Sequence, residues 1–141
     1  MIDWQARDTS THQGHVIAHV LGATALGYFI WDEAVYILLD IGFVWTIFRD
    51  GEMGLMPHPV AISELETTET IRAQLKADID ALLVNGPGAS ELLLMSPIPG
   101  CQITDVSFFD RGEERRLLVA GEDANLVVET SLESAEIRVY S

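Results

Sequence analysis

Three of the four histidines lie close together near the start of the chain, because His12, His15 and His19 fall within eight residues. Spacings of three and four residues would put all three on one face of a helix. Neutral imidazoles are the commonest protein ligands for zinc and similar ions. On a helix, these histidines would offer a metal site, which could serve a small metal-dependent hydrolase if an acid elsewhere acted as general base.

The secondary structure of residues 15–21 decides whether that site can form. Their apolar residues fit one face of a helix, at spacings of one, three and four, but they also alternate as a strand face would. Glycines on both sides leave a segment of strand length, so we favour the strand. In a strand His15 and His19 share a face while His12 lies outside it, and no local carboxylate orients the rings. We therefore expect no metal and no other cofactor.

Cys101 is the only cysteine, so it cannot form a disulfide within the chain. A catalytic thiol needs a neighbouring base or a helix N-terminus to lower its pKa, and the local sequence supplies neither. We expect a small buried hydrophobic residue. Motifs for phosphate loops, paired-cysteine metal sites and serine nucleophiles are also absent from the sequence, so no residue is assigned a catalytic role.

Charged residues form three further local groups. Asp32 and Glu33 are adjacent, so on a helix they would not face each other, and we expect them to cap a helix. Asp50 and Glu52 flank a turn glycine and are expected in solvent. Arg115–Arg116 follows a pair of glutamates, which favours a local ion-pair cluster over the alternative of an anion site.

Aromatic residues are concentrated in the first third of the chain, and at strand spacing such residues usually belong to the core. The alternative is a ligand pocket, which we would place between the sheet and the long helix. The residues concerned are Trp4, Tyr28, Phe29, Trp31, Phe43, Trp45 and Phe48.

The first half of the chain predicts strands at 26–31 and 43–48, and the second of these should be central because both its faces are apolar. Asp50–Gly51 predicts a hairpin that returns over 53–56. Between the strands, residues 32–41 repeat apolar side chains at helical spacing and favour a short helix, with a strand over 35–39 as the alternative.

The second half of the chain predicts one long amphipathic helix over about 68–84, with Ile71, Leu75, Ile79, Leu82 and Leu83 as its apolar stripe. Residues 85–100 are rich in proline and glycine and favour a connection, with a possible strand at 91–95. Four strands should follow as a meander, over 103–109, 116–120, 126–132 and 135–140. The whole indicates a single α+β domain over 1–141, with antiparallel sheet built from two clusters of strands.

The net charge of −14, from 22 acids and 8 bases, argues against two classes of partner. Nucleic-acid affinity rests on neutralising phosphates with basic side chains, and anionic lipid surfaces repel acidic proteins. The longest apolar run, residues 20–31, has 12 residues, which is short of the roughly 20 that a membrane-spanning helix needs. We therefore expect a soluble protein that binds neither nucleic acid nor membrane.

These observations favour a non-catalytic acidic binding or regulatory domain that acts through protein or small-molecule contacts; the alternative is the hydrolase that would use His12, His15 and His19. A basic protein is a possible partner on charge grounds. The chain is 48% hydrophobic, which favours a homo-oligomer, and a single cysteine favours the cytoplasm.

The charge imbalance predicts that salt stabilises the fold at neutral pH. Like charges repel one another in the compact state, and salt screens that repulsion. The melting temperature near pH 7 should therefore rise when moderate sodium chloride is added. A melting temperature that falls under the same conditions would contradict the prediction.

Overall fold

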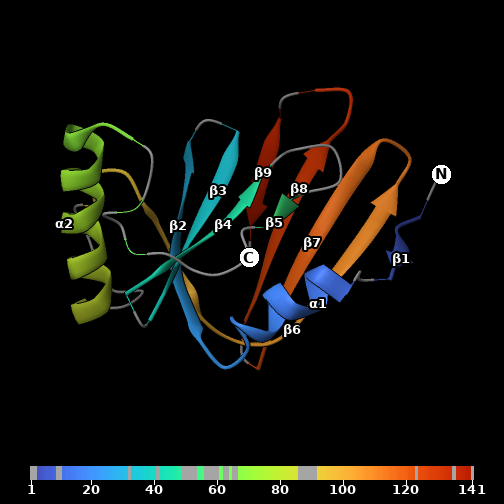
Figure 1. The fold of residues 1–141 in the computed structure, drawn as a ribbon, viewed down its shortest axis with the longest axis horizontal. Helices are drawn as coiled ribbons and strands as arrows, with labels where there is room; N and C mark the ends of the chain where they lie inside the picture. The colour runs from blue at the N-terminus through green and yellow to red at the C-terminus, as the bar shows by residue number, and fades with distance from the viewer. Residues whose placement is uncertain are drawn as a thin grey trace.

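The computed structural model describes residues 3–8, 11–31, 33–40, 42–48, 54–55, 61, 64, 67–85, 92–122, 124–134 and 136–140. Within these residues two helices and nine strands follow one another along the chain (Figure 1). They are β1 (Gln5–Arg7), α1 (Thr11–Ala18), β2 (Thr24–Trp31), β3 (Ala34–Leu39), β4 (Val44–Phe48), β5 (Gly54–Leu55), α2 (Glu69–Asn85), β6 (Ser96–Arg111), β7 (Glu114–Gly121), β8 (Asn125–Ser131) and β9 (Ile137–Tyr140).

The described strands form one antiparallel sheet in the order β5-β4-β3-β2-β6-β7-β8-β9, with β1 also paired to β6. The 16-residue strand β6 joins the two groups of strands. Its first residues pair with β2, while residues 103–111 pair with β7. The predicted antiparallel α+β class is thus confirmed, but the described strands form one sheet that β6 makes continuous, rather than two clusters.

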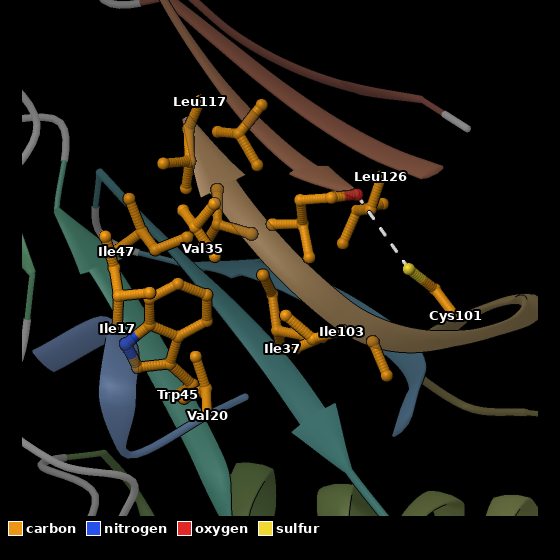
Figure 2. Close-up of a cluster of buried hydrophobic side chains, with 14 of the residues drawn as sticks. Ile17, Val20, Val35, Ile37, Trp45, Ile47, Cys101, Ile103, Leu117 and Leu126 are labelled. Atoms are coloured by element: carbon orange, nitrogen blue, oxygen red, sulfur yellow. Dashed lines mark hydrogen bonds between the residues drawn. The ribbon is translucent and has the colours of Figure 1, made fainter. Parts of the chain in front are cut away.

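The main core lies between the inner faces of the two groups of strands (Figure 2). Ile37 and Trp45 come from one group, Leu117 and Leu126 from the other, and all four side chains are fully buried. Helix α1 packs against the same core, to which it and the turn after it contribute Val16, Ile17 and Val20. Burial of apolar side chains on this scale is the main stabilising term of the fold.

A second core lies on the opposite face of β2–β4, where α2 covers the sheet (Figure 1). Leu75, Ile79 and Leu82 of α2 pack with Leu38 of β3 and Val44 of β4. The predicted amphipathic helix is confirmed, apart from the place of Leu83, which is exposed. The prediction that the 43–48 strand is covered on both faces is also confirmed, since residues 44–47 are all buried. Among the described strands, however, β4 is not central but lies next to the edge strand β5.

Asp78 of α2 fixes the path of the chain into β6. Its carboxylate is buried and accepts three consecutive backbone N–H groups, from Leu93 at 2.7 Å, Leu94 at 2.6 Å and Met95 at 2.7 Å. These hydrogen bonds satisfy backbone donors in a segment that has no regular secondary structure. The carboxylate therefore holds the chain against α2 one residue before β6 begins.

Two close contacts explain why glycine stands in the strands that adjoin β6. A Cβ on Gly27 would lie 2.9 Å from both the Ser96 carbonyl oxygen and a methyl group of Leu82. A Cβ on Gly121 would lie 2.7 Å from the Cys101 sulfur. Both positions adjoin register shifts, where irregular pairing lets a strand bend.

The structure corrects two predictions of element type. Residues 15–21 are not a strand, because 11–18 form α1, and a helix is what brings only Val16, Ile17 and Val20 into the core. Residues 32–41 are not a short helix, because 34–39 form β3 between β2 and β4. Strands covered on both faces are apolar at every position, so their sequence also contains helical spacings.

The structure also settles the remaining strand boundaries. At the start of the chain, Gln5–Arg7 forms a strand that was not predicted from the sequence, and it pairs with β6. The predicted strand at 91–95 is wrong for the described residues 92–95, and the proline-containing residues 96–100 belong to β6 instead. The hairpin return is confirmed by the pairing of Phe48 with Gly54, while its turn at 49–53 lies outside the described residues. The four strands of the meander are confirmed.

In the described part of the chain, neither helix has the length and apolar character that crossing a membrane requires.

Replacing Asp78 by alanine should cost about 3 kcal/mol of unfolding free energy, because three backbone donors would lose a buried charged acceptor. Asp80→Ala is the matched control: Asp80 lies on the exposed side of the same helix, so its loss should stay within about 0.5 kcal/mol. Urea denaturation of both variants measures the two values. Equal losses would show that the carboxylate of Asp78 does not hold the entry to β6.

Candidate functional site

The histidines do not form a metal site within the described residues. His15 lies on α1 and His19 in the turn after it, and both are exposed. The helix tightens at this end, because the His19 N–H bonds to the Val16 carbonyl three residues earlier. The side chain of His12 lies outside the described residues, and elsewhere no three potential ligands come close enough to hold a metal ion.

Cys101 is buried as predicted and lies at the edge of the main core (Figure 2). Its thiol donates to the backbone carbonyls of Ala124 at 3.2 Å and Val119 at 3.8 Å. Burial raises the pKa of the thiol, which keeps it protonated and unreactive at neutral pH. Cys101 therefore serves packing.

Of the two acidic groups, only Glu33 lies within the described residues, and it does not cap a helix. Glu33 is exposed in the turn between β2 and β3, with a φ of 60°, so the predicted helix-capping role is wrong for this residue. Asp32, Asp50 and Glu52 lie outside the described residues.

Arg115 and Arg116 form separate ion pairs, because neighbouring residues of a strand point to opposite faces of the sheet. Arg115 pairs with Asp110 at 3.4 Å, and Arg7 reaches the same carboxylate at 3.2 Å. Arg116 Nε donates to Glu129 on the other face, at 2.7 Å. Both arginines thus form ion pairs, but with Asp110 and Glu129 of other strands, and the two do not share the local cluster that the sequence predicted.

The outer face of β6–β9 carries a network of charges that no helix covers. We call it the arginine cluster; it consists of Trp4, Arg111, Glu114, Arg116, Glu129 and Arg138. Neighbouring strands bring its members together: Arg116 of β7 lies opposite Glu129 of β8, which lies opposite Arg138 of β9. Arg111 of β6 lies opposite Glu114 of β7.

The contacts of the arginine cluster form a closed ring. Glu114 accepts hydrogen bonds from Arg111 and Arg138, at 3.1 Å each, and Arg138 also lies 3.4 Å from Glu129. The guanidinium groups of Arg111 and Arg116 lie 4.3 Å and 4.1 Å from the centroid of the Trp4 ring. The indole thus joins the two ends of a chain of alternating charges through cation–π contacts.

Glu129 is the buried centre of this network, with only 5% of its surface exposed. Burial alone raises the pKa of its carboxyl group, but hydrogen bonds from Tyr140 and Arg116 and the charges of Arg116 and Arg138 lower it further than burial raises it. The pKa of Glu129 therefore lies below its ordinary value. Burial and the hydrogen bond to Glu129 raise the pKa of the Tyr140 hydroxyl, which donates at 2.6 Å.

The aromatic residues are divided among four parts of the molecule. Trp45 lies in the main core, where Tyr28 also packs, and Trp4 belongs to the arginine cluster. Phe43 is exposed beside the start of β4. In the space between the sheet and α2, where the alternative placed a ligand pocket, apolar side chains of the second core pack together. The remaining aromatic residues lie together at the edge of this second core.

We call this group the aromatic ledge; it consists of Phe29, Trp31, Tyr36 and Phe48. Phe29 of β2 lies opposite Tyr36 of β3, with ring centroids 6.1 Å apart, and stacks on Trp31 at 6.4 Å. Ala34 of β3 pairs with both Trp31 and Phe48. Because side chains two residues apart share a face of a strand, all four aromatic rings lie on the face that α2 covers.

The ledge lies where the cover from α2 ends. Phe29 and Tyr36 pack against the second core, but Trp31 and Phe48 remain 39% and 37% exposed. Glu33, in the turn after Trp31, places an exposed acid at this end of β2. The ledge therefore offers partly exposed aromatic rings, against whose faces a cationic group can lie.

Comparison of the chain with protein-family models, with curated proteins and with solved structures found no match.

The sequence did not identify either the ledge or the arginine cluster as a unit. Phe29, Trp31 and Phe48 were noted, but Tyr36 was assigned to a short helix. Arg116 was noted beside Glu114, whereas Glu129 and Arg138 lie on later strands. Aligning the polar positions of the predicted meander across its hairpins would have brought Arg116, Glu129 and Arg138 together.

Glu129→Gln should cost about 2 kcal/mol of unfolding free energy at pH 7, because the arginine and tyrosine donors would lose a buried charged acceptor. A lowered pKa in the folded state means that ionised Glu129 stabilises the fold fully above its ordinary pKa of 4.5, and that this contribution is lost as pH falls through the lower folded value. The variant should therefore lose less stability than the wild type on acidification below about pH 5.

Urea denaturation across this pH range measures both effects, with Glu133→Gln at an exposed position as the matched control. If both variants followed the same pH dependence as the wild type, the stabilising role of ionised Glu129 would be wrong.

Proposed function

We propose that this protein is a non-catalytic binding domain that holds a basic, partly apolar segment of another protein on the aromatic ledge. The observation that carries the proposal is the partial exposure of stacked aromatic rings in a chain with a net charge of −14. Single exposed apolar residues are ordinary, but a contiguous group beside a covered core is typical of an interaction site.

Charge distribution supports a basic partner. Residues 9–99, which include the ledge and α2, contain 11 of the 22 acids but only three of the eight bases. The other five bases are Arg7, Arg111, Arg115, Arg116 and Arg138, all on β1 and β6–β9. Residues 9–99 thus carry a net charge of −8 and the other 50 residues a net charge of −6, so a cationic segment would meet long-range attraction from the whole chain, and its arginine or lysine side chains could lie over the rings.

The alternative of a metal-dependent hydrolase has no support within the described residues, where no three metal ligands come together. A cytoplasmic location remains part of the proposal, supported by the sole cysteine being a free thiol. The absence of nucleic-acid binding also remains a proposal that rests on charge.

A homo-oligomer is a further proposal, supported by ten large apolar side chains that are exposed in the described part of the chain. The ledge is a poor place for two copies to meet, since each carries a net charge of −14. We therefore propose that the basic partner binds the ledge and that copies of the chain associate through other exposed apolar residues.

A synthetic peptide of alternating arginine and leucine should bind the protein, and Trp31→Ser/Phe48→Ser should weaken the binding by about tenfold, or about 1.4 kcal/mol. Fluorescence polarisation of the labelled peptide measures the affinity. Leu83→Ser/Val84→Ser is the matched control, because it removes two exposed apolar side chains from α2 and should leave the affinity unchanged. A peptide of alternating glutamate and leucine should not bind.

Equal weakening by both double variants would overturn the ledge as the site, and failure of the wild type to bind the basic peptide would overturn the choice of partner. Light scattering of the same samples tests whether a second copy of the chain binds at the ledge. If the wild type is an oligomer and only the ledge variant is a monomer, a second copy occupies the ledge.

A further inference from the structure

The arginine cluster has more positive than negative groups, which is unusual on so acidic a chain. Three guanidinium groups face two carboxylates, so the cluster carries a net charge of +1 in a protein of −14. Among the described residues, the Nη1 groups of Arg111, Arg116 and Arg138 take part in no hydrogen bond. Donors therefore remain available around a site that already gathers negatively charged oxygens.

Glu114 differs from Glu129 in how firmly it is held. The Glu129 side chain is 6% exposed and is bound by Tyr140 as well as by arginine. The Glu114 side chain is 32% exposed, and its partner Arg138 is 52% exposed. Ion pairs that water reaches contribute little to stability, so the Glu114 carboxylate can leave its position at low cost.

The position of Glu114 shows what Arg111 and Arg138 can bind together. These two residues come from β6 and β9, the first and last strands of the meander, yet both guanidinium groups donate to the same carboxylate. They are therefore already placed to share one oxyanion. Glu114 would then be an internal ligand that fills the site.

We propose that Arg111 and Arg138 form a binding site for a small molecule that ends in a phosphate monoester, and that the ligand displaces the Glu114 carboxylate. A phosphate monoester carries about −1.5 to −2 charge at neutral pH and three acceptor oxygens, against the single charge of a carboxylate. It can take donors from both guanidinium groups at once, in the paired geometry that arginine and phosphate favour. Displacement of Glu114 raises the local charge from +1 to +2, which favours a doubly charged ligand.

Trp4 connects this site to the N-terminal strand. Arg111 lies over the indole ring, and Trp4 directly precedes β1, which pairs with residues 108–110 of β6. A ligand that draws Arg111 toward itself changes the cation–π contact with Trp4. Binding is therefore expected to alter the fluorescence of Trp4. This site lies apart from the aromatic ledge and does not depend on the function proposed for it.

The test is equilibrium dialysis of radiolabelled inorganic phosphate, and of O-phosphoserine, at constant ionic strength. Glu114→Gln removes the competing charge and should bind both probes about tenfold more tightly than the wild type. Glu122→Gln is the matched control, because it makes the same change at an exposed position in the turn after β7 and should bind like the wild type. Arg138→Gln and Arg111→Gln should each abolish binding, with the thermal transition showing that they fold.

Several results would overturn the proposal. Equal gains in Glu114→Gln and Glu122→Gln would show a general effect of net charge. Failure of Glu114→Gln to bind either probe at millimolar concentration would exclude the site, as would full binding by Arg138→Gln. Tighter binding of O-phosphoserine than of inorganic phosphate would favour a monoester, and the reverse order would identify free phosphate as the ligand. A fluorescence change on binding that Trp4→Phe abolishes would confirm the contact through Arg111.

Discussion

One strand has to serve two groups of strands, and the rest of the fold depends on how β6 meets this constraint. Its first residues pair with β2, and its last residues pair with β7 and β1. The register shift between Ile103 and Asp105 marks the point where pairing becomes irregular, which allows a strand to bend. Asp78 fixes where this strand begins, and Gly27 and Gly121 let neighbouring groups approach it closely.

Because β6 is shared, the inner faces of the two groups meet in one core while their outer faces are covered in different ways. Helix α2 covers β2–β4 with apolar side chains. Arginine side chains and Trp4 lie over the outer face of the meander, where long aliphatic stems can cover sheet surface while the charged ends reach water. Five of the eight bases lie on β1 and the strands of the meander, where they pair with carboxylates of the same sheet.

The sequence-based predictions were correct for elements that bury one face, because their hydrophobic pattern then shows the element type directly. Helix α2 has one buried stripe, and the strands of the meander alternate around short turns, so local patterns were sufficient. Strand β3 is covered on both faces and was wrongly predicted as a helix. Residues 15–21, which include the end of helix α1, were wrongly predicted as a strand. The apolar residues of this short segment fit both the spacing of a helix and the alternation of a strand. Neither error could be corrected without knowing what covers each face.

By itself the sequence determined the antiparallel α+β class, the long helix, the acidity and the burial of Cys101, because each depends on composition or on spacing within one element. Only the tertiary structure decided which residues meet. Arg116 and Arg138 are 22 positions apart and reach Glu129 through the register of three strands, while Trp4 reaches the same network through pairing with β6. The aromatic ledge likewise depends on where α2 stops covering the sheet. Contacts between distant segments are set by register and layer packing, which no local window of the sequence contains.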